Sequence, residues 1–333
     1  MQFSNVDIKR NVFIVAEVGN NHEGNFSVAQ KMITAAAKAK ADAVKFQTFV
    51  PELYCDALDI DRRSVLEKFQ LSFKQFELLS RQANDEGLVF FSTPFDLESA
   101  KFLNSIQDVF KISSGDNNFI PLINLICTFG KPTMVSSGLT DFEEISDIHQ
   151  RWHKNLSANE LIILHCVSAY PVQPEEACLS AIQTLREQFP TSTIGYSDHT
   201  IGSMAATAAV SLGARIVEKH FTLDHDMSSF RDHKISSNPK QFSDLVDKIR
   251  ETEMLTKDNR SKKGEAEKQN LIAMRRSLAA AVHIPAGTLL SEEHITWVRP
   301  GDGYSPKQIS VVLGKKTTKN LQRGQVFRMG DIH

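Results

Sequence analysis

The sequence predicts an α/β fold: a (β/α)8 barrel followed by a smaller β-rich domain. Apolar runs rich in β-branched residues alternate with segments whose apolar residues recur at helical spacing. Eight such runs occur in series, which is the number of strands in a closed parallel barrel. After residue 255 the alternation gives way to short strand-like runs broken by turns.

The eight predicted strands are largely apolar, as expected for parallel strands covered by helices. They span Val12–Val18, Ala43–Thr48, Leu88–Thr93, Val109–Ser113, Pro132–Ser136, Leu161–Cys166, Thr193–Ser197 and Ile216–His220. Predicted helices between them include Ser27–Lys40, Phe73–Glu86, Leu97–Ser105, Pro121–Phe129 and Gly202–Leu212. An open doubly wound sheet would show the same alternation. We favour the barrel because no glycine-rich dinucleotide fingerprint follows any strand.

The pattern divides the chain into three parts. The barrel is expected in residues 1–255, and the highly charged, nearly apolar-free residues 256–272 are typical of a linker. Residues 273–333 are too few for another barrel and contain the turn sequences Pro285-Ala-Gly287 and Arg323-Gly324. A domain of about 60 residues is near the size at which a core alone is marginally stable. We therefore expect it to gain stability from a neighbour.

Composition favours an enzyme or binding protein for a small molecule. Hydrophobic residues make up 41% of the 333, and the formal net charge is −2 with both signs intermixed, so neither a nucleic-acid nor a membrane-surface partner is indicated. The four cysteines, at 55, 127, 166 and 178, lack the close spacing of a zinc site. No signal segment precedes Asn11 and no apolar run is long enough for a membrane helix. A cytoplasmic location is expected.

Nearly every predicted strand ends in a polar group, and in barrels the chemistry lies at these ends. The residues are Glu17, Lys45, Gln47, Thr93, Lys111, Ser114, Asp116, Ser136, Ser168, Tyr170, Ser197, His199 and His220. The two imidazoles suit one divalent metal, the two lysines and the hydroxyls suit a phosphate and a carboxylate, and Glu17 suits acid–base work. Taken singly, a lysine here is usually solvated, a hydroxyl usually caps a helix and a histidine is usually structural. Their accumulation at one rim favours a site.

These motifs occur together in the order found in one family. They are Ala16-Glu-Val-Gly19, Asn21-His-Glu-Gly24, Val44-Lys-Phe-Gln47, Ser92-Thr-Pro94, Lys111-Ile-Ser-Ser-Gly115, Ser136-Ser-Gly138, Ser168-Ala-Tyr-Pro171, Gly195-Tyr-Ser-Asp-His199 and Glu218-Lys-His-Phe-Thr-Leu-Asp224. The chain resembles the sialic acid synthase family, whose members condense phosphoenolpyruvate with an N-acylated amino sugar to a nonulosonic acid. Residues 276–333 resemble its C-terminal antifreeze-like (SAF) domain.

The resemblance implies a role for each matching residue. His199 and His220 would bind Mn2+ or Mg2+, and Glu17 would face the reacting carbons. Phosphoenolpyruvate would be surrounded by Lys45, Lys111, Ser114, Ser136 and Ser197, and the sugar side would be lined by Gln47, Thr93, Asp116 and Tyr170. The resemblance further implies a homodimer in which the small domain of one subunit reaches the partner's barrel and contributes Arg276.

Departures from the family pattern leave the sugar open. Many bacterial relatives carry Glu where this chain has Asp116 and Asn where it has Ser168, and the surrounding sequences look more like the animal branch, which can use a phosphorylated sugar. N-acetylmannosamine, its 6-phosphate and the diacetamido sugars of legionaminic and pseudaminic acid all stay possible. Asp232 and His233 receive no role. The rival functions are a Schiff-base aldolase using Lys45 or Lys111, and a binding protein that retains the fold.

Overall fold

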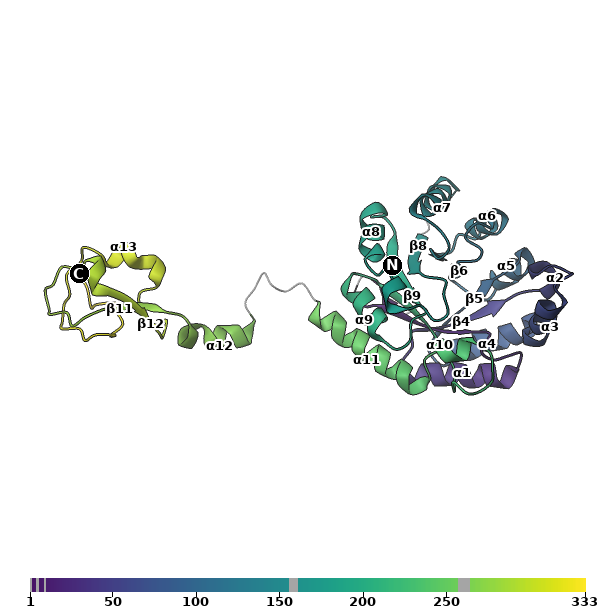
Figure 1. Cartoon of the computed structure of the whole chain (residues 1–333), viewed down its shortest axis with the longest axis horizontal. Coiled ribbons are helices and arrows are strands. Elements are labelled where there is room, and N and C mark those ends of the chain that lie inside the picture. Colours follow the sequence, from purple (N-terminus) through teal and green to yellow (C-terminus); the bar gives the residue numbers. More distant parts are fainter. Residues whose placement is uncertain (1, 4–5, 9, 156–160, 257–263) are drawn as a thin grey trace. The chain divides into compact units, whose positions relative to one another are not determined.

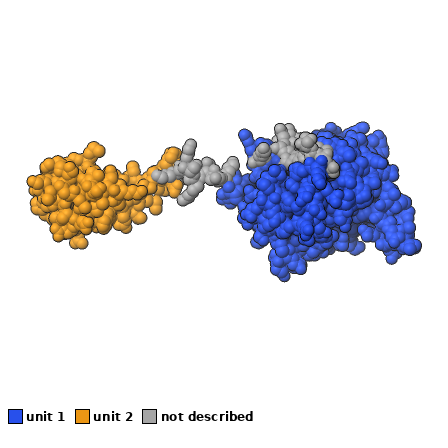
Figure 2. Space-filling view, turned by 90° about the horizontal axis from the view of Figure 1, so that it is seen from above, with its two compact units in different colours: residues 1–257 blue, residues 258–333 orange. Residues whose placement is uncertain are grey.

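The chain folds into two compact units. The computed structural model describes residues 2–3, 6–8, 10–155, 161–256 and 264–333, with one unit in residues 1–257 and the other in 258–333 (Figures 1 and 2). A short hairpin of β1 (Gln2–Phe3) and β2 (Val6–Asp7) begins the first unit. Within the described ranges, no helix combines the length and apolar character that crossing a bilayer requires.

The first unit contains an eight-stranded parallel sheet in the order β5-β4-β3-β10-β9-β8-β7-β6, and contacts between β5 and β6 bring its two ends together as a barrel (Figure 1). The strands are β3 (Phe13–Gly19), β4 (Ala43–Thr48), β5 (Val89–Pro94), β6 (Phe110–Ile112), β7 (Thr133–Ser136), β8 (Leu161–Cys166), β9 (Thr193–Asp198) and β10 (Ile216–His220). The predicted barrel is confirmed, and each predicted strand coincides with an observed one to within a few residues.

Helices surround the strands (Figure 1). They are α1 (Phe26–Lys38), α4 (Phe73–Asp85), α5 (Leu97–Leu103), α6 (Ile120–Thr128), α7 (Phe142–Asn155), α8 (Ala181–Gln188), α9 (Met204–Ser211), α10 (Asp232–Ile235) and α11 (Pro239–Leu255). The local sequence determines where several helices begin: Asn25 caps α1, and Ser72 and Asn238 form capping boxes at α4 and α11.

Apolar side chains fill the barrel interior toward the amino ends of the strands, and the carboxyl ends of the strands are polar. Phe13, Val15, Phe91 and Leu164 belong to one buried cluster inside the strands. Because side chains alternate along a strand, Glu17 follows Phe13 and Val15 on the inward face of β3. The same alternation brings the polar ends of the other strands to the mouth of the barrel.

An excursion between β4 and α4 was not predicted. It contains α2 (Pro51–Tyr54) and α3 (Ile60–Phe69). Most of α3 is charged or exposed, so its helical pattern is weak, but Leu66 and Phe69 are buried in a cluster with Phe49 and Phe95. The excursion therefore adds an apolar wall beside the ends of β4 and β5.

The second unit is small and mixed. It contains α12 (Glu265–Met274), an antiparallel pair of β11 (Ser277–Ala280) and β12 (Ile295–Val298), and α13 (Ile309–Val312). Its core is formed by Leu278, Ala280, Ile284, Leu290, Ile295, Val312, Leu321 and Phe327. Of the linker predicted at 256–272, residues 257–263 lie outside the described residues and 265–272 are helical in α12.

Candidate active site

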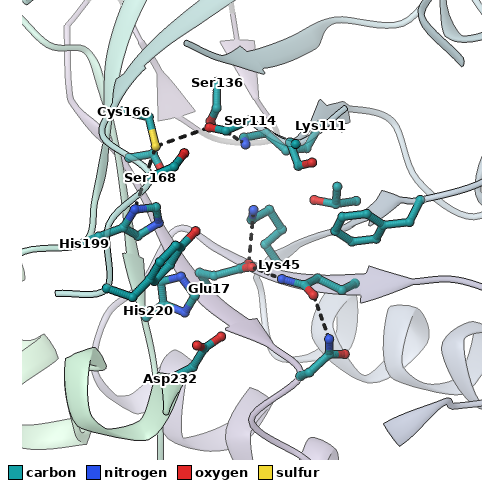
Figure 3. Close-up of a pocket in the computed structure, with 18 of the residues that line it drawn as sticks. Glu17, Lys45, Lys111, Ser114, Ser136, Cys166, Ser168, His199, His220 and Asp232 are labelled. Carbon is teal, nitrogen blue, oxygen red and sulfur yellow. Dashed lines mark hydrogen bonds and ion pairs between the residues drawn. The ribbon is translucent and has the colours of Figure 1, made fainter. Parts of the chain in front are cut away.

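A cavity of about 680 Å3 opens at the carboxyl ends of the barrel strands. It brings together every predicted barrel residue except Asp116. These residues are Glu17, Lys45, Gln47, Thr93, Lys111, Ser114, Ser136, Ser168, Tyr170, Ser197, His199 and His220. Figure 3 labels several of them, among them Glu17, Lys45, Lys111, His199 and His220.

Four ionisable groups form the buried centre of the cavity. Lys45 Nζ lies 3.3 Å from Glu17 Oε2 and 3.1 Å from Glu218 Oε2. Lys111 Nζ lies 3.9 Å from Glu218 Oε1 and donates a hydrogen bond to Ser136 Oγ at 2.7 Å. Ser197 Oγ donates to Glu218 Oε1 at 2.9 Å. Glu218 therefore lies between the two ammonium groups.

Glu17 and Glu218 have different pKa values because of their burial and the charges around them. Burial raises the pKa of Glu17 to about 7, although Lys45 opposes the rise. Burial alone would also raise the pKa of Glu218, but Lys111 and Lys45 outweigh it and bring that pKa to about 2. Burial lowers the pKa of Lys111, although the negative charge of Glu218 acts to raise it. Near neutral pH, Glu218 is ionised and Glu17 can hold or release a proton.

His199 and His220 face each other across one side of the cavity, with ring centroids 5.3 Å apart. His199 Nδ1 lies 2.8 Å from the carbonyl oxygen of Val167, and since a carbonyl only accepts, Nδ1 carries the hydrogen and Nε2 the lone pair. His220 Nδ1 is buried and has no hydrogen-bond partner among the described residues, and burial lowers the pKa of His220 well below its ordinary value. The ring of Tyr170 packs 4.3 Å from that of His199.

This pair fits a divalent metal as a two-histidine site. A carbonyl on the far ring nitrogen of a histidine is the usual support for a metal ligand. Burial lowers the pKa of His199, but the Cys166 sulfur and the Val167 carbonyl outweigh burial and raise it, so a metal would compete with a proton there. The described residues contain no group of three or more His, Cys, Asp or Glu arranged for a metal. Substrate and water oxygens would complete the coordination.

Two central residues were missed by sequence reasoning. Glu218 was noted within a motif and given no role, and Cys166 was considered only as the end of a predicted strand and as one of four cysteines without zinc-site spacing. Cys166 Sγ accepts a hydrogen bond from Ser114 Oγ at 3.5 Å and lies 3.9 Å from His199 Nδ1. Strand alternation could have found Glu218, because it precedes His220 by two residues on β10 and so shares its inward face.

Other predicted residues occupy the sides of the cavity. Gln47 Nε2 donates to Glu17 Oε1 at 3.3 Å, and Asn20 Nδ2 donates to Gln47 Oε1 at 2.7 Å. The hydroxyls of Thr93 and Ser168 are buried, and no residue in the described part of the chain hydrogen-bonds to them. These two oxygens are available to a bound molecule.

Asp116 is not among the residues that line the cavity, and Arg276 belongs to the other compact unit. Asp116 accepts a hydrogen bond from Ser113 Oγ at 2.5 Å in the turn after β6, and Ser113 lines the cavity in its place. The carboxylate of Asp116 is held by this local bond, and its expected role on the sugar side stays a prediction. Arg276 belongs to the second unit, where its guanidinium donates to the carbonyl oxygen of Trp297 at 2.7 Å.

The residues left without a role, Asp232 and His233, have different positions. Asp232 lines the cavity, next to Arg231, whose guanidinium lies 5.1 Å from the centroid of the Tyr170 ring. His233 is buried behind the cavity, with Nδ1 2.7 Å from Thr222 Oγ1 and Nε2 3.1 Å from Glu23 Oε1. His233 thus connects the loop after β10 to the loop after β3.

The outer wall of the cavity is largely apolar. It comes from the α2–α3 excursion and the loops after β5 and β10 and includes Tyr54, Val65, Leu66, Phe69, Phe95 and Phe230. Arg62 lies at this wall with its guanidinium 5.3 Å from the centroid of the Tyr54 ring. The cavity therefore has a floor with two buried lysines and two buried carboxylates, a histidine side and an apolar outer wall.

Comparison with known proteins identifies the family. The NeuB family profile matches residues 32–261, which is more than half of the chain. The chain belongs to the NeuB family. Residues 275–333 match the SAF domain, which confirms the expected identity of the C-terminal part. All cavity residues except Glu17 and Asn20 lie within the residues matched to the NeuB family.

Similarity within the NeuB family extends over the whole chain. The chain is 36% identical to pseudaminic acid synthase of Campylobacter jejuni, over all of both sequences. It is 32% identical to human N-acetylneuraminate-9-phosphate synthase, over 93% of this chain and 89% of the human protein. The crystal structure of N-acetylneuraminic acid synthetase from Leptospira borgpetersenii, in complex with citrate, is 33% identical with a TM-score of 0.77, over 81% of this chain and 94% of that one.

Proposed function

We propose that this NeuB-family chain is a nonulosonic acid synthase, an enzyme that condenses phosphoenolpyruvate with an N-acylated amino sugar to a nine-carbon 2-keto acid and phosphate. Relatives named as acid synthases support a transferase of this kind. The observation that carries the proposal is the buried Lys45–Glu218–Lys111 group beside His199 and His220. The proposed location is the cytoplasm.

The floor of the cavity suits phosphoenolpyruvate. Lys45 and Lys111 provide two buried ammonium groups. Glu218 neutralises one of them, and Glu17 is neutral while it holds its proton, which leaves positive charge for the phosphate and the carboxylate. The hydroxyls of Ser114, Ser136 and Ser197 orient the anionic oxygens. These groups are fixed before substrate arrives, so little reorganisation is needed as charge develops.

The proposed reaction forms one carbon–carbon bond and breaks one carbon–oxygen bond. C3 of phosphoenolpyruvate attacks the aldehyde carbon of the open-chain sugar, whose oxygen takes up the proton held by Glu17 and becomes a hydroxyl. C2 is left electron-poor and adds water, which gives a proton back to Glu17. The tetrahedral centre then expels phosphate, which carries away the proton of the new hydroxyl as that hydroxyl becomes the ketone. Because the pKa of Glu17 is about 7, that carboxylate can accept and return this proton near neutral pH.

His199 and His220 would hold the divalent ion, Mn2+ or Mg2+. When bound, such an ion supplies Lewis-acid polarisation of the sugar aldehyde. Tyr170 packs against His199 and helps fix its ring. The outer wall excludes water from the sugar side of the cavity, and its apolar surface fits the N-acyl and methyl groups of a diacetamido-trideoxy hexose. N-acetylmannosamine and its 6-phosphate remain rival acceptors, since Arg62 and Arg231 lie at the same wall.

A Schiff-base aldolase is the second candidate, because burial lowers the pKa of Lys111 as an amine nucleophile requires. Borohydride reduction in the presence of a keto-acid substrate would then attach the substrate covalently to Lys111. The synthase proposal predicts no such label, since Lys111 is held as a charged group between Ser136 and Glu218.

We further propose a homodimer in which the second unit of one copy supplies Arg276 to the cavity of its partner. Family resemblance supports this arrangement. Mixing an Arg276→Ala subunit with a His199→Gln subunit would test it, because mixed dimers would contain one intact site and would regain part of the activity lost by each variant. Failure to regain any activity after subunits have exchanged would reject a role for Arg276 across the dimer.

Phosphate release from phosphoenolpyruvate tests the function itself. We expect release with Mn2+ that depends on an added sugar and stops with EDTA, measured with N-acetylmannosamine, its 6-phosphate and 2,4-diacetamido-2,4,6-trideoxy hexoses. The sugar that gives the largest kcat/KM identifies the acceptor. Absence of sugar-dependent release with every one of these acceptors would contradict the proposed function.

A further inference from the structure

Helix α7 carries two histidines, His149 and His153, one turn apart on the outside of the barrel (Figure 1). Residues four apart in a helix share one face, so both imidazoles project from the same side of α7. Their Nε2 atoms lie 3.0 Å apart, and their ring centroids lie 4.3 Å apart with the planes at 65°. Neither residue lines the active-site cavity.

The separation of the two nitrogens fits one metal ion. Imidazole nitrogens bind transition metals at about 2.0–2.1 Å. Two nitrogens at that distance from one ion and 3.0 Å from each other subtend roughly 90° at the ion. This is the angle between neighbouring ligands in square-planar or octahedral coordination, which Cu2+ and Ni2+ adopt with nitrogen and oxygen ligands, whereas a tetrahedral ion would need about 3.4 Å between the nitrogens.

The surroundings favour such a site. The ring of His149 is half-buried and packs against Phe189 with centroids 4.9 Å apart, so one ligand is already oriented. His153 is exposed, which leaves the other coordination positions open to water. Both residues lie in the C-terminal half of α7, whose end carries the negative pole of the helix dipole and attracts a cation.

We propose that His149 and His153 form a chelating site for Cu2+ or Ni2+, independent of the His199–His220 pair and of the proposed synthase activity. The same 3.0 Å separation would also suit a simple hydrogen bond in which one ring donates Nε2–H to the other. The two explanations differ in what they predict for added metal, because only the chelate binds an ion.

Metal binding by the full-length protein distinguishes them. EDTA-treated, dialysed protein is equilibrated with Cu2+ or Ni2+ alone, and bound metal per chain is measured. We expect His149→Gln and His153→Gln each to bind about one equivalent less than the unaltered chain, and the Cu2+ electron paramagnetic resonance spectrum to lose its signal for that two-imidazole site. His283→Gln, which removes an exposed histidine from the second unit, should bind the unaltered amount.

A relocation variant keeps the number of histidines constant. In the double variant His153→Gln/Gln150→His the two imidazoles, at positions 149 and 150, are adjacent in sequence and point in different directions from the helix. The variant should therefore still bind about one equivalent of metal less than the unaltered chain. Equal metal content in the unaltered chain and in His153→Gln, or full binding by the relocation variant, would overturn the proposal. Thermal unfolding without metal, expected to be unchanged in all variants, shows that each has folded.

Discussion

Glu218 Oε2 lies 3.1 Å from Lys45 Nζ, in a pair whose side chains are each 5% exposed. Removing two charges from water costs several kcal/mol for each, and the mutual attraction offsets that cost only when both partners are present. Lys111 approaches the other oxygen of the same carboxylate. Glu218 therefore contacts both lysines on the floor of the cavity, whereas Glu17 pairs with Lys45 alone.

Glu218→Gln should impair both stability and phosphoenolpyruvate binding. The two ammonium groups would lose their shared counter-ion, so the pKa of Lys111, already lowered by burial, should fall further. We expect a loss of about 3–5 kcal/mol in the free energy of unfolding, as for other buried pairs that lose one partner. The KM for phosphoenolpyruvate should rise at least tenfold. Urea unfolding and steady-state kinetics measure the two effects.

A surface ion pair supplies the control. Lys40 and Asp247 form a pair at 2.9 Å in which both side chains are more than half exposed. Asp247→Asn should change stability by less than about 1 kcal/mol and leave the kinetics unaltered. A Glu218→Gln variant that behaved like Asp247→Asn would contradict the role of Glu218 as the shared counter-ion.

Removing either cavity histidine should abolish metal-dependent turnover. His199→Gln and His220→Gln each leave one imidazole, which is too few protein ligands to hold a divalent ion among the oxygens of substrate and water. We expect phosphate release to fall at least 100-fold with each variant at saturating Mn2+. His283→Gln, distant in sequence and exposed, should retain full activity. Full activity in both cavity variants would remove the metal assignment.

His22 should make the protein acid-sensitive. Burial lowers its pKa from 6.5 to about 4, against a weaker opposing effect of Glu23. As pH falls from about 6.5 toward 4, the unfolded chain binds a proton at this position that the folded chain does not, so stability falls by roughly 2–3 kcal/mol. Above pH 6.5 both states are neutral at His22 and the contribution is constant.

His22→Asn isolates this effect. The Asn side chain can still accept the hydrogen bond that the Gly24 N–H donates to His22 Nδ1 at 3.0 Å. Urea unfolding at pH 8 and pH 4.5 should show a smaller difference in stability for the variant than for the unaltered chain. His283→Asn should keep the original difference. An unchanged difference in His22→Asn would mean that His22 is not the group responsible.

Much of the barrel could be predicted because strand and helix periods are local properties of the sequence. The inward residues of β4, β9 and β10 follow from alternation once their strands are known, as Lys45, Ser197 and His220 show. Glu218 was accessible to the same reasoning and was missed because its motif was read only for the histidine.

The rest depends on tertiary contacts that no local pattern reveals. The α2–α3 excursion is held by Leu66 and Phe69 against Phe95, although most of α3 is charged or exposed. Asp116 immediately follows the polar strand-end sequence that carries Ser114, yet a hydrogen bond from Ser113 holds its carboxylate in the turn. The pKa of Glu17 depends on burial and on lysines from two other strands, so it could not be read from the chain.

Gly138 should be essential for the shape of the cavity floor. A Cβ at this position would overlap Ser168 Oγ and Ser114 Oγ and would lie 3.0 Å from Ser114 Cβ. The backbone of Gly138 does not have a positive φ, so alanine is disfavoured by crowding and not by conformation. Gly138→Ala should therefore displace Ser114 and lower kcat/KM for phosphoenolpyruvate at least tenfold, with a loss of about 1–3 kcal/mol in stability.

The control for this crowding is Gly264→Ala, since within the described part of the chain no atom other than those of its sequence neighbours lies within 4 Å of the added Cβ. It should match the unaltered chain in activity. Adding Ser168→Ala to Gly138→Ala removes one of the two overlapping oxygens and should restore part of the lost stability, because the strain is steric. If the double variant is no more stable than Gly138→Ala, the overlap with Ser168 is not the source of the strain, and the contact with Ser114 alone must account for it.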